Sequence, residues 1–349
     1  MHKLEKIFRT AVQYKASDIY ISTGIKPTLR INGELVPIAE HPVLTKKMAE
    51  EYLLEIMSEP QKRSFEKTLD IDFSLDIETI SRFRVNMFVQ KNGIGAVFRL
   101  ISDKVPTMDE LGLPAQLKKA PNFPNGLVIV TGPTGSGKST TLAAMINEIN
   151  KTQGKHIITV EDPIEYVHKD QKSLIQQREV GTHTHSFERA LVSALRESPD
   201  VILIGEMRNL ETIQHAITAA ETGHLVFATL HTSGCAKSIN RIIDSFPYQQ
   251  QNQIRAQISE SLKAVFWQKL LKTKDGKGRV AAIETMFVNN AIANMIRKGT
   301  THQIDSAIET SAKEGMQTMK KAITDLYQAN LISEETAMEN MPKEFDQPE

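Results

Sequence analysis

The sequence lacks the features of a secreted or membrane-spanning chain. Its 349 residues include one cysteine, Cys235, which excludes an internal disulfide and favours a reducing compartment. No apolar run approaches the ~20 residues that a transmembrane helix needs. The first residues are amphipathic and charged, which is not the pattern of a signal peptide. We therefore expect a cytosolic protein with no membrane span of its own, which can still dock on a membrane complex.

An excess of either charge is missing too. Lysine and arginine together number 42, as do aspartate and glutamate, so the formal net charge is zero. Proteins whose main partner is nucleic acid usually carry a basic excess, and we expect no nucleic-acid partner here. The remaining composition is that of an ordinary globular protein, long enough for two or three domains.

What the sequence does contain is a segment with the pattern of a phosphate-binding loop. Residues 127–130 are apolar and predict a buried strand, and residues 138–149 favour a helix. The turn between them fits the motif G-x-x-x-x-G-K-[ST]. In such a loop, backbone N–H groups and the positive end of the helix attract phosphate oxygens. A structural glycine turn is the alternative, but the flanking strand and helix favour nucleotide binding.

The motif gives a role to each part of the loop. Lys138 can reach the β- and γ-phosphates, and Ser139 can hold Mg²⁺ together with waters. The predicted ligand is therefore ATP or ADP with Mg²⁺. The predicted nucleotide-binding residues are Gly132, Pro133, Thr134, Gly135, Ser136, Gly137, Lys138, Ser139 and Thr140.

The residues before the loop predict a separate small domain. Alternating strands and two helical stretches indicate an α+β domain with an antiparallel sheet over residues 1–100. A cluster of prolines then marks a change in composition, and we assign a linker to residues 101–118. A P-loop α/β domain with C-terminal helices occupies residues 119–349. Within it, one long helix is expected at residues 249–271 and one or two strands at residues 280–288.

Acidic residues follow the next apolar strand of this domain. Residues 156–160 predict a parallel strand, and Glu161, Asp162 and Glu165 cluster at its carboxyl end. Ligands of open α/β sheets bind outside the carboxyl ends of the strands, so these carboxylates can face the phosphates and Mg²⁺. Glu161 is then a second candidate ligand for the metal. The alternative is that the acids cap the start of a helix.

A further apolar strand, residues 201–204, also ends in an acid. Glu206 stands beside it, in the arrangement of a Walker B strand, whose acid orients Mg²⁺ or polarises the attacking water. Gly205 stands where the metal-binding aspartate of that motif is usual, so Glu206 is predicted to be the general base. The alternative is an exposed charge at the end of a strand.

Two histidines and two arginines are weaker candidates. His224 and His231 bracket a third predicted strand, where they could sense the γ-phosphate or a neighbouring subunit, although a lone histidine is more often structural. Their separation along an extended strand makes them poor ligands for one metal ion. Arg84 and Arg99 lie on alternating strands of the first domain, where solvated charge is the simpler interpretation.

Several segments occur together in one order. They include the loop from Gly132 onward, Glu161-Asp-Pro-Ile-Glu, Ile204-Gly-Glu-Met-Arg and the stretch from Thr222 to Thr232. With this set the chain resembles the secretion-superfamily ATPases, and among them the retraction motors of type IV pili. The resemblance covers almost the whole chain, including Arg82-Phe-Arg-Val-Asn in the first domain.

The resemblance implies a fold, an assembly and residue roles. The first domain would be PAS-like and the second RecA-like, with six subunits in a ring. The acids after residue 160 match the family's Asp box, Glu206 its atypical Walker B and the two histidines its His box. Arg84 and Arg99 match arginines that reach the γ-phosphate from the first domain. Catalytic roles are therefore expected for Glu206, Glu161, Arg84, Arg99, His231 and His224.

The same resemblance implies partners and a place in the cell. The expected partners are further copies of the chain, an inner-membrane platform protein of a type IV pilus machine, and a paralogous ATPase. The expected location is the cytoplasmic side of the inner membrane, at the base of the pilus.

One C-terminal segment departs from the family pattern. Retraction motors carry a motif similar to Ala-Ile-Arg-x-Leu-Ile-Arg-Glu, and here the segment starting at Ala291 has Ala293 for the first arginine and Lys298 for the final acid. Arg297 is kept. Because the motif is linked to retraction, its alteration leaves open whether the motor retracts the pilus. Parts of the chain also resemble the accessory retraction ATPase.

These observations lead to one hypothesis and three alternatives. We expect an ATP-driven hexameric motor that depolymerises a pilus. An accessory or assembly ATPase of the same superfamily is the nearest alternative. A hexameric nucleic-acid translocase is a second, against which the zero net charge and the lack of an aromatic and basic groove count. A nucleotide-switched scaffold without turnover is the third.

Overall fold

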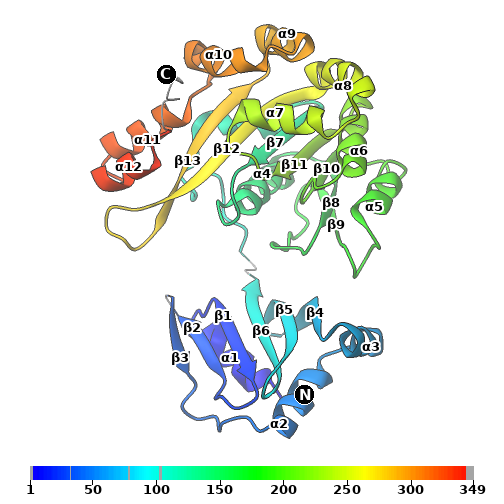
Figure 1. The fold of residues 1–349 in the computed structure, drawn as a ribbon, viewed down its shortest axis with the longest axis vertical. Helices are drawn as coiled ribbons and strands as arrows, with labels where there is room; N and C mark the ends of the chain where they lie inside the picture. Colours follow the sequence, from blue (N-terminus) through cyan, green and yellow to red (C-terminus); the bar gives the residue numbers. More distant parts are fainter. Residues whose placement is uncertain (1–2, 32, 78, 102–103, 343–349) are drawn as a thin grey trace. The chain divides into compact units, whose positions relative to one another are not determined.

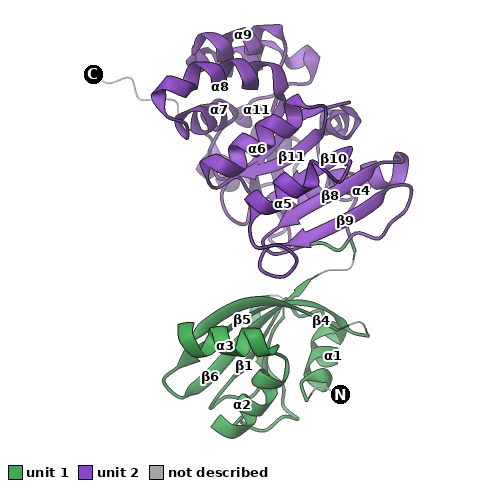
Figure 2. Ribbon diagram, turned by 90° about the vertical axis from the view of Figure 1, so that its right-hand side faces the viewer, with its two compact units in different colours: residues 1–104, 165–167 green, residues 105–164, 168–349 purple. Residues whose placement is uncertain are grey.

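The structure is a computed structural model that describes residues 3–31, 33–77, 79–101 and 104–342. The chain divides into two compact units, shown in Figure 2. Unit 1 comprises residues 1–104 and 165–167, and unit 2 comprises residues 105–164 and 168–349.

In the described residues, unit 1 is an antiparallel sheet with three helices (Figure 1). Its sheet has six strands in the order β3-β2-β1-β6-β5-β4. Its elements are α1 (Glu5–Gln13), β1 (Asp18–Ser22), β2 (Thr28–Ile31), β3 (Glu34–Pro37), α2 (Lys46–Glu55), α3 (Glu59–Thr68), β4 (Asp70–Ile77), β5 (Ser81–Gln90) and β6 (Gly93–Ile101).

The three helices bury one face of that sheet. Phe8 of α1 stacks on Phe83 of β5 with ring centroids 4.6 Å apart and meets Phe98 of β6 edge-on at 5.1 Å. Leu53 of α2 and Phe65 of α3 join the same core. Side chains alternate between the faces of a strand, so residues one position away from these aromatics lie on the other face.

Unit 2 is built on a mostly parallel sheet of seven strands. The order is β13-β12-β7-β11-β10-β8-β9, and only the β12–β13 pair is antiparallel. Its strands are β7 (Gly126–Thr131), β8 (His156–Glu161), β9 (Leu174–Glu179), β10 (Val201–Ile204), β11 (Leu225–Leu230), β12 (Leu262–Lys272) and β13 (Arg279–Phe287). Its α-helices are α4 (Lys138–Thr152), α5 (Phe187–Ala194), α6 (Leu210–Glu221), α7 (Cys235–Asp244), α8 (Tyr248–Ser261), α9 (Asn290–Lys298), α10 (Ile304–Thr310), α11 (Met319–Gln328) and α12 (Glu334–Asn340), and its short 3₁₀ turns are η1 (Ala115–Asn122), η2 (Thr301–Gln303) and η3 (Ala312–Glu314).

Helices cover both faces of this sheet, which explains why its central strands are apolar throughout. Leu127 and Ile129 of β7 face a core shared with α5 to α10, whereas Val128 and Val130 face α4 and η1. All six residues of β7 are buried. A continuous apolar run is the expected signature of a parallel strand covered on both faces, and it delivers the loop after Thr131 to the carboxyl edge of the sheet.

The predicted helix over residues 249–271 is wrong in its second half. Helix α8 ends at Ser261, and residues 262–272 form β12 between β7 and β13. This segment has three leucines and three lysines among its 11 residues, and both residue types favour helices in isolation. Pairing with strands on both sides overrides that local preference.

Two further differences concern local elements. The structure assigns residues 105–118, which lie in the predicted linker, to unit 2, because Met108, Leu113 and Leu117 are buried in its core. Helix α3 and strand β9 are not among the predicted elements. The sequence does carry a signal for α3, since Ser58 and Gln61 form a capping box at its start.

A buried glutamate joins the sheet of unit 2 to two helices. Glu284 of β13 accepts hydrogen bonds from the backbone N–H of Cys235 at 2.9 Å and of Met319 at 3.3 Å, the first residues of α7 and α11. Burial raises the pKa of Glu284. Burial also raises the pKa of the neighbouring Cys235 thiol well above its usual value, so the single cysteine is a poor nucleophile.

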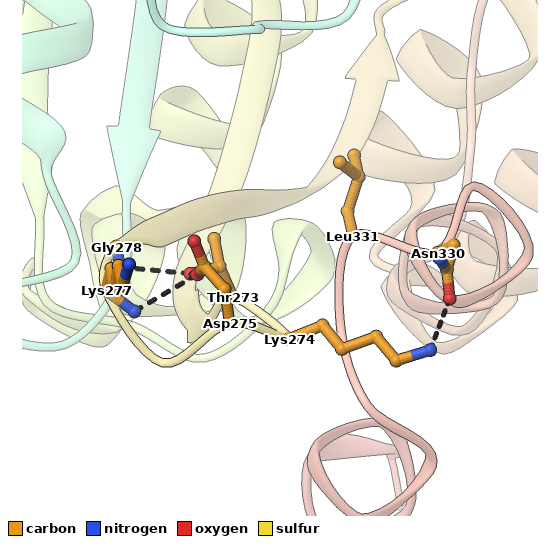
Figure 3. Close-up of a pocket in the computed structure, with 7 residues that line it drawn as sticks. All are labelled: Thr273, Lys274, Asp275, Lys277, Gly278, Asn330 and Leu331. Carbon is orange, nitrogen blue, oxygen red and sulfur yellow. Dashed lines mark hydrogen bonds between the residues drawn. The ribbon is translucent and has the colours of Figure 1, made fainter.

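The surface of unit 2 has a pocket between the β12–β13 turn and the loop after α11 (Figure 3). In it, Lys274 Nζ donates a hydrogen bond to Asn330 Oδ1, which ties the hairpin to the C-terminal helices. The residues that line it are Thr273, Lys274, Asp275, Lys277, Gly278, Asn330 and Leu331. None of them is a predicted site residue. None of the described helices combines the length and apolarity that a membrane crossing requires.

The burial of His168, in the loop between β8 and β9, leads to a test of stability against pH. Burial lowers the pKa of His168 from 6.5 to about 4. Protonation therefore favours the unfolded chain, so stability is complete above pH ~6.5 and falls as the pH drops toward ~4. Between pH ~7.5 and ~5 this group should account for a loss of about 2 kcal/mol. In urea unfolding followed by Trp267 fluorescence, His168→Gln should shrink the pH dependence by that amount.

The exposed His302 of the same unit provides the control variant His302→Gln. An unchanged pH dependence in His168→Gln would show that this histidine does not titrate with unfolding.

Candidate nucleotide-binding and hydrolysis site

The predicted phosphate loop connects β7 to α4. Lys138, the first residue of α4, is 8% exposed. Its Nζ atom donates hydrogen bonds to the backbone carbonyls of Gly132 at 2.9 Å and Pro133 at 3.1 Å. The positive charge of Lys138 is thus held against the start of the loop. Ser139 and Thr140 follow in the first turn of the helix, and both are half-buried.

Glycine is required at the start of this loop for a steric reason. Gly132 has a φ of +149°, and a Cβ atom there would lie 2.3 Å from the backbone oxygen of Gln268 in β12. It would also lie 2.7 Å from Ser136 Oγ. No side chain fits in that space, so the loop can approach β12 only through a glycine.

Threonine hydroxyls fix the other side of the loop. The Oγ1 atom of Thr131, the last residue of β7, accepts a hydrogen bond from the Thr232 backbone N–H at 2.9 Å and lies 2.7 Å from Thr232 Oγ1. Thr232 Oγ1 in turn lies 2.6 Å from Ser238 Oγ of α7. The start of the phosphate loop is therefore tied to the segment that follows β11.

Three predicted site residues meet at the carboxyl ends of β8, β10 and β11. Glu206 Oε1 lies 3.2 Å from His231 Nε2, and Glu206 Oε2 accepts a hydrogen bond from Arg208 Nε at 2.7 Å. Arg208 Nη1 reaches Asp162 Oδ2 at 3.8 Å. The strands are parallel neighbours, so their carboxyl ends share one edge, as the sequence analysis expects. Arg208 was not singled out, although it belongs to the same motif as Glu206.

The backbone explains the glycine before Glu206. A Cβ atom on Gly205 would lie 3.2 Å from the Cα atom of Glu161 and 3.3 Å from the Val160 carbonyl oxygen. The Gly205 carbonyl oxygen also accepts a hydrogen bond from Thr229 Oγ1. An aspartate at this position would crowd the end of β8, so the acidic function falls to the next residue.

The hydrogen bonds of Glu161 and His224 go to other residues than Glu206, Arg208 and His231. Glu161 Oε1 accepts hydrogen bonds from Thr159 Oγ1 at 2.7 Å and Gln177 Nε2 at 3.3 Å. Glu165 is exposed. His224 precedes β11 at its amino end, where Nδ1 lies 3.0 Å from the Ala219 carbonyl oxygen. The structure therefore brings His231 to Glu206 but does not bring His224 there.

Arg297 lies on the surface of the C-terminal helices. Its Nη2 atom donates a hydrogen bond to Ser259 Oγ at 3.2 Å and lies 3.6 Å from Glu260 Oε1. Both partners belong to α8, so this arginine of α9 joins two helices. Two residues differ from the family motif: Ala293, in place of the first arginine, is half-buried, and Lys298, in place of the final acid, is exposed.

Arg84 and Arg99 are direct cross-strand partners in unit 1. They face each other on β5 and β6, on the sheet face opposite the aromatic core. Asp18 of β1, with only 8% of its side chain exposed, accepts a hydrogen bond from Arg99 Nε at 3.0 Å. Like charges placed directly opposite each other destabilise a sheet, and the carboxylate of Asp18 offsets part of the positive charge of this pair.

Comparison with known proteins relates the chain to secretion-system proteins and type IV pilus ATPases. The profile of the family described as "Type II/IV secretion system protein" matches residues 1–341. The chain is 50% identical over 332 residues to "Type IV pilus retractation ATPase PilT" of Pseudomonas aeruginosa, with 95% of this chain and 96% of that protein covered. It is 43% identical over 336 residues to "Type IV pilus ATPase PilU" of the same organism, with 96% and 90% covered.

The fold is similar to that of a solved relative. A crystal structure of "the Pilus Retraction Motor PilT and Bound ADP" matches with a TM-score of 0.91 and 44% sequence identity, and 98% of each chain is covered. Together with the two units described above, this match confirms the predicted fold class, an α+β N-terminal unit followed by a RecA-like P-loop unit.

The Glu206 cluster leads to a test of its predicted role as the general base. Glu206→Gln keeps the size of the side chain but cannot accept a proton at neutral pH. Turnover of ATP should fall by at least ~10²-fold, the scale of general-base catalysis, while the Kd for ATP stays close to that of the wild type. Steady-state hydrolysis and equilibrium binding measure the two quantities separately.

Glu197→Gln is the matched control. Like Glu206, Glu197 is a partly buried glutamate of unit 2, and its carboxylate is ion-paired with Arg178 at 3.1 Å. The variant should retain turnover. Full activity in Glu206→Gln would remove this residue from the chemistry.

Proposed function

This chain belongs to the Type II/IV secretion system protein family, and we propose that it is an ATP-hydrolysing motor that drives the retraction of type IV pili. The observation that carries hydrolysis is that the phosphate loop after β7 and Glu206 after β10 leave the same carboxyl edge of one parallel sheet, on either side of β11. The assignment to pilus retraction is supported by 50% identity to PilT over nearly the full length of both proteins.

In this proposal the loop binds the phosphates and Glu206 activates water. The backbone N–H groups from Gly132 to Thr140 and the ammonium of Lys138 supply positive potential to the phosphate oxygens. Each carboxylate oxygen of Glu206 has two acceptor sites. The side chain can therefore receive a proton from water while it keeps its contacts with Arg208 and His231.

Two of the predicted site residues offer oxygen ligands suited to Mg²⁺. Ser139 offers a hydroxyl in the first turn of α4, and Glu161 offers a carboxylate already oriented by Thr159 and Gln177. Oxygen ligands of this kind, completed by waters and phosphate oxygens, suit Mg²⁺. When bound, the ion would neutralise charge on the phosphates. Ser139 is the proposed ligand and Glu161 the second candidate.

The proposed assembly is a ring of six copies. It would work on the cytoplasmic side of the inner membrane at the base of the pilus, with an inner-membrane platform protein and a paralogous ATPase as partners. Likeness to PilT over nearly the whole chain supports this arrangement. His224, at the opposite edge of the sheet from Glu206, is assigned to contact with a neighbouring subunit.

An accessory role is the second candidate function. Ala293 and Lys298 depart from the motif of retraction motors, which favours the accessory ATPase. The lower identity to PilU, 43% against 50% for PilT, counts against it. We therefore assign retraction to the chain and regard Arg297 as the residue of that motif that this chain retains.

Arg84 and Arg99 are proposed to bring positive charge to the γ-phosphate during hydrolysis. Arg84→Gln should lower kcat by ~10³-fold or more, the scale of an arginine that stabilises phosphoryl charge, and should leave ADP binding nearly unchanged. Arg9→Gln is the control, because Arg9 is an exposed arginine of α1 in the same unit, and its ion pair is with Glu5 at 2.8 Å. Equal kcat values in the Arg84 variant and the wild type would exclude the role.

The direction of work is tested by the number of surface pili. Cells that lack this protein, and cells that carry Glu206→Gln, should have excess pili and no surface motility, because extension continues without retraction. Cells carrying Glu197→Gln serve as the control. Bald cells would indicate an assembly motor, and normal pili in both strains would indicate an accessory role. Salt-sensitive binding of single-stranded DNA that stimulates ATP hydrolysis would instead support a translocase.

A further inference from the structure

Gln268 is a buried polar residue whose side chain packs against the phosphate loop from β12. It is 2% exposed and belongs to β12, the parallel neighbour of β7. Its Nε2 atom donates a hydrogen bond to the backbone carbonyl of Ser136 at 2.7 Å. Its Oε1 atom accepts a hydrogen bond from Thr141 Oγ1 of α4 at 2.8 Å. A carbonyl oxygen can only accept, so the amide nitrogen must face Ser136.

This contact fixes the direction of the next N–H group. The peptide bond between Ser136 and Gly137 is trans, so its C=O and N–H groups point in opposite directions from one rigid plane. Because the Ser136 carbonyl points at Gln268, the Gly137 N–H points away from β12. In phosphate-binding loops, backbone N–H groups such as this one line the concavity that holds the phosphate oxygens.

Both ends of the loop are in close contact with the same residue. A Cβ atom on Gly137 would lie 2.9 Å from Gln268 Nε2, and one on Gly132 would lie 2.3 Å from the Gln268 backbone oxygen. The loop therefore rests on Gln268 at its first glycine and at its last. A change in the side-chain amide of Gln268 should therefore shift the backbone of the loop.

We propose that Gln268 is a positioning residue for the nucleotide phosphates, which acts by holding the Gly137 N–H in its binding direction. The inference rests on the proposed nucleotide-hydrolysing function and adds to that site a residue outside its motifs. Gln268 has no contact with the nucleotide in this role. It acts through the Ser136–Gly137 peptide, and the hydrogen bond from the Thr141 hydroxyl holds its amide in place.

The test is the affinity for Mg·ADP and the kinetics of ATP hydrolysis in Gln268→Met and Gln268→Glu. Methionine keeps the length of the side chain without a donor, and glutamate presents an acceptor to the Ser136 carbonyl. The Kd for Mg·ADP and the KM for ATP should rise by about 10-fold, the scale of one hydrogen bond to a charged group. kcat should change much less, because the N–H binds the phosphate before and during the reaction.

A matched variant separates this role from loss of stability. Gln317 Nε2 donates a hydrogen bond of the same 2.7 Å length to the backbone carbonyl of Ile283 in β13. Gln317→Met should lower the melting temperature to a similar extent and leave Kd and KM unchanged. A Gln268→Met variant that loses stability but keeps its Kd and KM would overturn the proposal.

Thr141 provides a second, independent test if the Gln268 variants fail to fold. Thr141→Val removes the hydroxyl that holds the Gln268 amide in place and should raise the Kd for Mg·ADP, whereas Thr141→Ser keeps the hydroxyl and should keep the wild-type Kd. Equal affinities in Thr141→Val and the wild type would overturn the proposal. A wild-type protein that does not bind Mg·ADP would overturn the proposed function and, with it, this inference.

Discussion

The attachment of the phosphate loop to strands on both sides is the constraint on which the rest of unit 2 depends. Gln268 of β12 holds the loop from one side through Ser136, and the pair Thr131–Thr232 holds it to the segment after β11 on the other. The fully buried β7 lies between them. Because the loop backbone can move only together with these neighbours, it is pre-organised to bind phosphates without a large loss of entropy on binding.

The acidic centre depends on the same parallel geometry. Glu206 reaches its position because β10 runs parallel to β8 and β11, and their carboxyl ends bring Asp162, Arg208 and His231 around it. Arg208 offsets negative charge that would otherwise gather from two carboxylates at one edge. A Cβ atom on Gly205 would lie 3.2 Å from the Cα atom of Glu161, so a side chain there would crowd the end of β8, and the acid stands one residue later.

The strand that supports the loop also reaches the C-terminal helices. Leu271 of β12 and Ala282 of β13 pack with Met319 and Ile323 of α11, and the carboxylate of Glu284 accepts hydrogen bonds from the starts of α7 and α11. A shift of these helices would therefore act on the sheet beside the phosphate loop. The departure of the α9 segment from the family motif, with Ala293 in place of arginine, lies in the same C-terminal region.

The sequence by itself determined the phosphate loop, its flanking strand and helix, and the acids after the two following strands, because these signals are local and lie within a few residues. It also indicated the α+β unit that precedes them. Only the tertiary structure decided that residues 262–272 form a strand and that Arg208 bridges two carboxylates. It alone placed Gln268 under the loop, since Thr141 and Gln268 are 127 positions apart. Contacts of that range depend on which strands become neighbours, and the pattern of a single segment does not contain that information.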